Sequence, residues 1–187
     1  MSARAVTLTC ALFVSLAASN ARAQHVPPPA YQSAARAAGV PSEILFAVAM
    51  QESGIALRGQ LIPWPWTLNA AGEPSRYATR RDACSALRRE LKTRRNVDVG
   101  LGQVNVRYHG HRVKEPCELL DPYRNLAITA TILREQHAAG ADWLLAVSRY
   151  HRPAGGAPAQ DYRERVERHL ARLLAPTTAP LSRGAHP

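Results

Sequence analysis

The sequence predicts one mainly helical domain with a small β-hairpin. Several segments repeat apolar residues at spacings of three and four, the period of an amphipathic helix. These segments begin at capping residues and end at glycines, which are the signals that bound helices. One segment breaks the pattern with the run Pro63-Trp64-Pro65-Trp66, which cannot be helical because proline lacks a backbone donor and clashes with the preceding turn.

Two helices are expected before this segment. Tyr31 to Ala38 predicts a short helix that stops at Gly39. Ser42 is expected to be the N-cap of a strongly apolar helix from Glu43 to Ser53. The hairpin is then expected within Leu61 to Tyr77. Its parts are the strands Thr67-Leu68-Asn69 and Ser75-Arg76-Tyr77 and a turn around Ala71-Gly72-Glu73-Pro74.

The second half of the chain is again mostly helical. Asp82 to Leu91 predicts a helix with Cys84 and Leu87 on one face, and Asn96 to His111 predicts a loop around the turn Gly100-Leu101-Gly102-Gln103. Three helices follow: Asp121-Pro122 to about Ala139, Asp142 to Tyr150, and Asp161 to Leu174. The inward residues of the last helix are Tyr162, Val166, Leu170 and Leu173. The domain is expected to cover residues 24–175, and Pro176 to Pro187 is expected to be a disordered tail.

Residues 1–23 have the features of a secretory signal peptide. Arg4 gives a positive start, and Val6 to Ala18 form an apolar run that is too short to span a bilayer. Ala21-Arg22-Ala23 offers small residues for cleavage before Gln24. We expect export to the periplasm, and the alternative is an uncleaved membrane tether.

The chain is strongly basic, with a formal charge of +10. Without Arg4 and Arg22, 22 basic residues face 14 acidic ones, so a charge of about +8 remains after cleavage. Such a surface suits an anionic partner, whether nucleic acid, membrane headgroups or a cell wall with free carboxylates. Because the chain is expected to be exported, the cell wall is the most suitable of these partners. A role in nucleic-acid binding explains the charge alone, so no nucleic-acid partner is expected.

The mature chain keeps an even pair of cysteines. Cys10 lies in the signal peptide, which leaves Cys84 and Cys117 in an oxidising compartment. We predict a disulfide between them. The alternative, a catalytic or metal-binding thiol pair, lacks a C-x-x-C motif or a second ligand cluster. His109 and His111 also lack a third ligand at a suitable spacing, so neither a metal nor a cofactor is expected.

Glu52 is the candidate catalytic residue. It shares a helical face with Leu45 and Val48, which places its carboxyl group on the apolar side. Burial raises the pKa of a carboxyl group, and a proton retained near neutral pH is what a general acid needs. The alternative is that the helix frays and Glu52 faces water.

Three further motifs change the balance between these interpretations. Glu52-Ser53, Gly100-Leu101-Gly102-Gln103-Val104-Asn105 and Tyr150-His151 stand in the order and approximate spacing of the soluble lytic transglycosylase domain, which the chain resembles from about Pro41 to Tyr150. Pro63-Trp64-Pro65-Trp66-Thr67-Leu68-Asn69 and Asp98-Val99-Gly100 are similar to segments of the muramidases that accompany conjugation and type IV secretion systems. Each motif is weak alone, and their joint order is specific.

The resemblance implies a lysozyme-like α+β fold and a defined reaction. The family cleaves the β-1,4 bond between N-acetylmuramic acid and N-acetylglucosamine and leaves a 1,6-anhydro end. Glu52 is thereby expected to protonate the leaving oxygen and then to act as base on the C6 hydroxyl of the sugar. A second carboxylate is not required, because the N-acetyl group takes its place, so we interpret Asp98 as a structural residue that holds the loop before Gly100.

The resemblance also implies the substrate-binding residues. Ser53 is expected to orient the substrate or the acid, with helix capping as the alternative. Tyr150 is expected to point its hydroxyl at Glu52, with core packing as the alternative. The remaining candidates are expected to line the cleft: Trp66, Gln103, Asn105 and His151. Two of the positions depart from the family, since Gly102 replaces a frequent methionine and His151 replaces the usual asparagine.

The expected partners are peptidoglycan strands and components of a conjugation or type IV secretion apparatus, and the chain is expected to be a monomer. Two alternatives to the transglycosylase remain. One is a hydrolase similar to goose-type lysozymes, and the other is a catalytically silent wall-binding scaffold, which the departures at Gly102 and His151 motivate.

Overall fold

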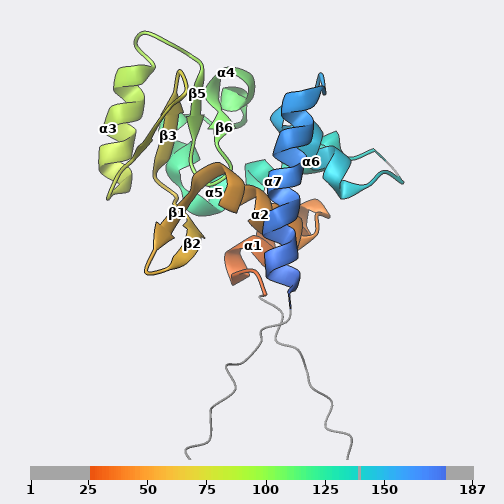
Figure 1. The fold of residues 1–187 in the computed structure, drawn as a ribbon. Helices are drawn as coiled ribbons and strands as arrows, with labels where there is room; N and C mark the ends of the chain where they lie inside the picture. Colours follow the sequence, from red (N-terminus) through yellow and green to blue (C-terminus); the bar gives the residue numbers. More distant parts are fainter. Residues whose placement is uncertain (1–25, 139, 176–187) are drawn as a thin grey trace, which may run out of the picture. The chain divides into compact units, whose positions relative to one another are not determined.

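The computed structural model describes residues 26–138 and 140–175. The predicted signal peptide, 1–23, and the predicted tail, 176–187, lie outside these residues. Within the unit Gln24–Ala175, helices pack beside two small antiparallel sheets (Figure 1). The mainly helical class with a small β part is therefore confirmed. None of the helices in the described ranges has the length and apolar character that crossing a bilayer requires.

Helices and strands follow one another in groups along the chain. The helices are α1 (Pro29–Ala38), α2 (Ser42–Ser53), α3 (Arg80–Glu90), α4 (Val106–His109), α5 (Pro122–Gln136), α6 (Trp143–His151) and α7 (Ala157–Leu174), with the short 3-10 turns η1 (Gly110–Arg112) and η2 (Pro116–Leu120). The strands are β1 (Gly54–Leu57), β2 (Gln60–Pro63), β3 (Thr67–Ala70), β4 (Glu73–Arg76), β5 (Val97–Val99) and β6 (Val104–Asn105). β1 pairs with β2, and the second sheet has the order β4-β3-β5-β6.

Helix α2 lies in the larger of two apolar clusters. Its buried residues fall on all sides of the helix, so it has no polar face to offer to water: Ile44, Leu45, Ala47, Val48, Ala49, Met50 and Ser53. Helices α1, α5 and α7 contribute the other large members of this cluster, among them Tyr31, Leu133 and Tyr162. This packing fixes the direction in which the end of α2 points, and Glu52 lies at that end.

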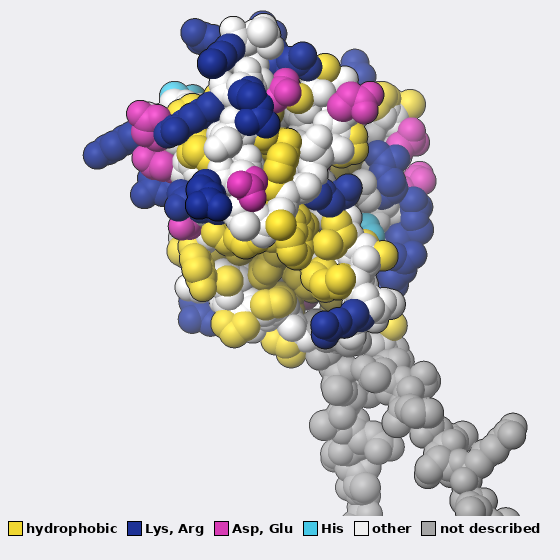
Figure 2. All heavy atoms as spheres, turned by 90° about the vertical axis from the view of Figure 1, so that its left-hand side faces the viewer, with side chains coloured by type: hydrophobic (Ala, Val, Ile, Leu, Met, Phe, Trp, Pro, Cys, Tyr) yellow, Lys and Arg dark blue, Asp and Glu magenta, His cyan; other side chains and the backbone are white. Residues whose placement is uncertain are grey.

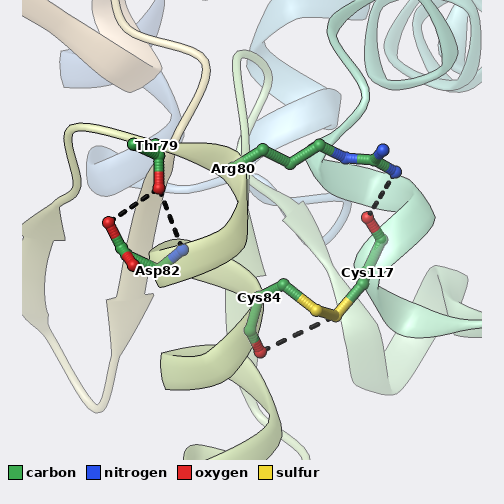
Figure 3. Close-up of a disulfide and its surroundings, with 5 residues drawn as sticks. All are labelled: Thr79, Arg80, Asp82, Cys84 and Cys117. Carbon is green, nitrogen blue, oxygen red and sulfur yellow. Dashed lines mark hydrogen bonds between the residues drawn. A yellow bond between two sulfur atoms is a disulfide. The ribbon is translucent and has the colours of Figure 1, made fainter.

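The second apolar cluster lies between the four-stranded sheet and α3. Leu68, Val99 and Leu87 are among its fully or almost fully buried members. The predicted disulfide Cys84–Cys117 is confirmed and ties α3 to η2 (Figure 3). Helix α3 begins two residues earlier than predicted because Thr79 is its N-cap, with a side chain that accepts a hydrogen bond from Asp82 N.

The predicted hairpin is confirmed as β3–β4, with a shorter turn than expected. Ala71 and Gly72 form the turn, and both have positive φ, 57° and 87°. A two-residue turn with this backbone matches the twist of paired strands. The prediction of a loop over residues 96–111 is wrong, since this segment holds β5, β6 and α4, and the hairpin β1–β2 was not predicted.

Three helix boundaries also differ from their predictions. Ser42 is the first residue of α2 and not its cap, because Pro41 occupies the cap position without a side-chain bond. Helix α5 ends at Gln136, and Gly140, with φ 76°, belongs to the following turn instead of ending the helix. Helix α7 begins at Ala157, because Pro158 fits the first turn of a helix, where no backbone donor is needed.

Candidate active site

A cleft of about 730 Å³ opens between the end of α2, the four-stranded sheet and the end of α6. Glu52 reaches it from α2. Asn69, Asp98 and Asn105 line it from the sheet, and Tyr150 and His151 line it from the last turn of α6. Residues far apart in the chain therefore meet at one opening that is large enough for a small ligand or a sugar unit.

Glu52 is sheltered as its sequence context predicts. It is partly buried in the last turn of α2, above Leu45 and Val48, which have no exposed surface. Burial first, and then the negative charge of Asp98, raise the pKa of Glu52 from 4.5, and the resulting pKa is about 7. A hydrogen bond from Tyr162 and the positive charge of Arg165 lower it. The carboxyl group is thus balanced between its two protonation states near neutral pH.

Tyr162, and not Tyr150, is the tyrosine bonded to Glu52. The Tyr162 hydroxyl donates to Glu52 Oε1 at 2.6 Å, across 110 positions of the chain. The Tyr150 hydroxyl donates instead to Gly102 O at 2.6 Å, so the expected contact of Tyr150 with the acid is wrong. Tyr162 was predicted only as a core residue. One feature of the sequence could have indicated this bond. Tyr162 was expected to point inward, and a buried phenol needs a hydrogen-bond acceptor.

His151 covers the other side of this tyrosine. Its ring stacks on that of Tyr162 with centroids 4.4 Å apart and planes inclined by 2°. Partial burial and the nearby charges of Arg165 and Arg152 lower the pKa of His151. The ring is therefore neutral at neutral pH, so it adds hydrogen-bonding capacity to the cleft without a positive charge beside Glu52.

Ser53 does not face the cleft. Its side chain has no exposed surface, and its hydroxyl donates to Ala49 O at 3.0 Å and Leu101 O at 2.8 Å. The expected contact with substrate is therefore wrong. Ser53 instead joins the end of α2 to the turn at Gly100–Gln103, which sets the distance between Glu52 and that wall of the cleft.

The turn after β5 is held by its own side chains. Gln103, with φ 48°, lines the cleft and donates from Nε2 to Gly100 O at 2.8 Å and to Thr67 O at 3.2 Å. Gly102 is buried, and a Cβ atom at this position would overlap Thr129 of α5. The absence of a side chain at position 102 therefore leaves room for Thr129 against this turn.

A row of three polar residues crosses the sheet below Glu52. Asn69 lies opposite Asp98, and Asp98 lies opposite Asn105, so all three point to the same face and line the cleft. Asn105 Nδ2 donates to Asp98 Oδ1 at 2.6 Å, and partial burial raises the pKa of Asp98. The side chain of Asp98 therefore faces the same space as Glu52, and the interpretation of Asp98 as a structural residue stays a prediction.

Trp66 does not line the cleft. It packs against the second apolar cluster and meets Trp64 edge to face, with centroids 5.7 Å apart and planes at 86°. Its indole Nε1 is buried without a hydrogen-bond partner among the described residues. The predicted contact of Trp66 with a sugar ring is therefore wrong.

Five of the seven predicted catalytic and substrate-binding residues meet in one cleft: Glu52, Gln103, Asn105, Tyr150 and His151. The two exceptions, Ser53 and Trp66, are used in packing. Comparisons with family models, curated proteins and solved structures return no match to this chain. The case for a function therefore depends on the cleft and on the motifs that supply its residues.

Proposed function

We propose that the chain is a peptidoglycan lytic transglycosylase with Glu52 as its single catalytic acid and base. The observation that carries this proposal is a sheltered carboxyl group with a pKa of about 7 in an open cleft. General acid catalysis is most efficient when the pKa of the acid lies near the working pH. The motifs that bring Glu52, Gln103 and Tyr150 together are those that the transglycosylase resemblance names.

The first step is proton transfer from Glu52 to the glycosidic oxygen. Because Tyr162 donates to Oε1, we assign the mobile proton to Oε2. The same Tyr162 hydroxyl then stabilises the carboxylate that the transfer leaves behind. The bond between C1 of the muramic acid and the glycosidic oxygen breaks, and the N-acetylglucosamine leaves with the transferred proton on its hydroxyl. The Glu52 carboxylate removes the proton from the C6 hydroxyl of the muramic acid, whose oxygen attacks C1 and closes the 1,6-anhydro ring. The proton returned to Glu52 restores the starting state.

The sheet supplies the opposite wall of the cleft. Asn69 and Asn105 provide amide groups that suit hydroxyl and N-acetyl groups of a glycan, and Asp98 holds a negative charge toward the positive charge that develops on the sugar ring. A lysozyme-like fold belongs to the proposal as well. It is supported by a cleft between a helical part and a small antiparallel sheet, with the acid at a helix end.

A hydrolase is the second candidate, and Asp98 is the observation that favours it. Two carboxyl groups facing one cleft match the number that an inverting glycosidase uses, in which one acts as acid and the other activates water. The products separate the two reactions. Hydrolysis adds one water and leaves a reducing end, whereas ring closure does neither.

The setting of the reaction follows from the same resemblance. A predicted signal peptide and a basic mature chain suit work on the anionic wall in the periplasm. Local opening of the wall for a conjugation or type IV secretion apparatus, by a monomer without nucleic-acid partners, is the role we propose.

The deciding experiment is incubation of the mature protein with purified sacculi and mass analysis of the released muropeptides. We expect 1,6-anhydro products from the wild type and from Glu43→Gln, a matched change in the first turn of the same helix. Glu52→Gln should release none. Reducing-end products would establish the hydrolase, and equally poor release by wild type and Glu52→Gln would establish the silent scaffold.

A further inference from the structure

The hairpin β1–β2 carries aliphatic side chains on both of its faces. Its register places Ile55 opposite Ile62 and Leu57 opposite Gln60 on one face, and Ala56 opposite Leu61 on the other. Leu57 and Leu61 are 46% and 40% exposed. A hairpin that packs on a core normally alternates apolar and polar residues, so aliphatic side chains on both faces indicate a second apolar environment.

The hairpin belongs to neither apolar cluster of the described residues. None of its leucine or isoleucine side chains is a member of either cluster or packs against one. It is fixed at its base, where Trp64 N donates to Ser53 O at 3.0 Å and Gly54 N bonds to Met50 O. The aliphatic side chains therefore project from a firmly held base.

Basic side chains lie at the tip and beside the base of the hairpin. Its ten residues, Gly54–Pro63, contain no acidic side chain, and Arg58 stands at the tip. Arg76 of β4 donates to Gly54 O at 3.3 Å, beside the base. Figure 2 shows hydrophobic side chains gathered on this face and, above them, many Lys and Arg side chains with a few Asp and Glu side chains among them. The basic residues of α3 and the turn after it are exposed: Arg80, Arg81, Arg88, Arg89, Lys92, Arg94 and Arg95.

We propose that the β1–β2 hairpin is a membrane-docking element that inserts Leu57 and Leu61 into an anionic phospholipid surface. Aliphatic side chains enter the boundary of the acyl chains, while nearby arginines contact the phosphates. Two other binding partners of the hairpin, a second copy of the chain and a glycan strand, are less suitable. A second copy would bring like charges together, and glycan offers no aliphatic interior for leucine. The inference does not depend on the proposed enzyme activity.

The test is sedimentation of the mature protein with vesicles of equal parts phosphatidylcholine and phosphatidylglycerol, and with vesicles of phosphatidylcholine alone. We expect binding to the anionic vesicles and a loss of at least about tenfold in the partition coefficient for the double variant Leu57→Asn/Leu61→Asn. The matched control, Leu145→Asn/Leu174→Asn, changes two leucines that are 38% and 53% exposed elsewhere and should bind as the wild type does. Arg58→Gln should weaken binding to the vesicles that contain phosphatidylglycerol and should not change binding to vesicles of phosphatidylcholine alone.

Three results would overturn the inference. They are binding to neither vesicle, undiminished binding by the Leu57→Asn/Leu61→Asn variant, and a dimer in light scattering that this variant abolishes. Circular dichroism and sacculus digestion by the same variant show whether it is folded. A protein that binds vesicles but does not digest sacculi would refute the proposed function and leave the docking element standing.

Discussion

Removal of the Tyr162 hydroxyl should shift the pH dependence of activity upward. This hydroxyl donates to Glu52 Oε1 at 2.6 Å and lowers the pKa of Glu52, whereas burial raises it, and the resulting pKa is about 7. A hydrogen bond to a charged group contributes about 1.5–3 kcal/mol, and one pKa unit corresponds to about 1.4 kcal/mol. Tyr162→Phe is therefore expected to raise the pKa of Glu52 by about one to two units.

The sign of the effect follows from the role of Glu52 as proton donor. The wild type loses activity as the pH rises through the pKa of Glu52, and the Tyr162→Phe variant should lose it about one to two pH units higher, with a lower maximal rate. The assay is the initial rate of solubilisation of purified sacculi across the pH range. Tyr150→Phe is the matched control, because the Tyr150 hydroxyl donates to Gly102 O and not to the acid. An alkaline limb that does not move in Tyr162→Phe, or that moves equally in Tyr150→Phe, would show that the Tyr162 hydroxyl does not set the pKa of Glu52.

Three further predictions concern stability. The raised pKa of Glu52 means that stability is lost as the pH rises from 4.5 through about 7, so Glu52→Gln should stabilise the fold above that range, by at most on the order of 3 kcal/mol, and leave it unchanged below 4.5. Urea unfolding at both ends of the range measures this, and a difference that is independent of pH would contradict it. Removal of the disulfide by Cys84→Ser/Cys117→Ser, which opens a loop of 33 positions, should lower the free energy of unfolding by between about 3 and 4 kcal/mol. A reductant should weaken the wild type to the same level and leave this variant unaffected, and equal stability of the two oxidised proteins would argue against the prediction. Gly102→Ala should lower stability by about 1–3 kcal/mol because its Cβ overlaps a side chain of α5, whereas Gly110→Ala, where the nearest atom is 3.4 Å away, should change it little. Equal unfolding midpoints for these two variants would show that the position tolerates a side chain.

The position of the acid was accessible to sequence reasoning because it depends on one helix. The spacing of Leu45, Val48 and Glu52 places them on one face whatever packs against it. The disulfide was accessible for a similar reason, since the mature chain offers one even pair of cysteines in an oxidising compartment. The hairpin β3–β4 was marked by turn residues within a segment that proline excludes from helices.

The partners of Glu52 were not accessible in this way. Tyr162 reaches the acid because α7 packs against α2, and a contact across 110 positions leaves no local pattern. Ser53 illustrates the converse. A polar residue beside the acid suggested a role with substrate, yet the Ser53 hydroxyl donates a hydrogen bond to the backbone carbonyl of Leu101 in a distant turn.

The direction of the Asp98 side chain and the presence of the hairpin β1–β2 were not accessible to sequence reasoning, for different reasons. Asp98 faces the cleft because β5 pairs with β3 and β6 in a particular register, and a register shift of one residue would turn it away. The strands of β1–β2 lack the alternation of apolar and polar residues on which strand prediction depends, since both faces carry aliphatic side chains.

The central claim is that Glu52 keeps its proton close to neutral pH. Titration of the Glu52 carboxyl carbon by NMR in the mature protein measures this directly, with Glu52→Gln to assign the resonance. We predict a midpoint near pH 7, the pKa that the surroundings of Glu52 impose. A midpoint at the ordinary value of 4.5 would contradict it and remove the general acid from the cleft.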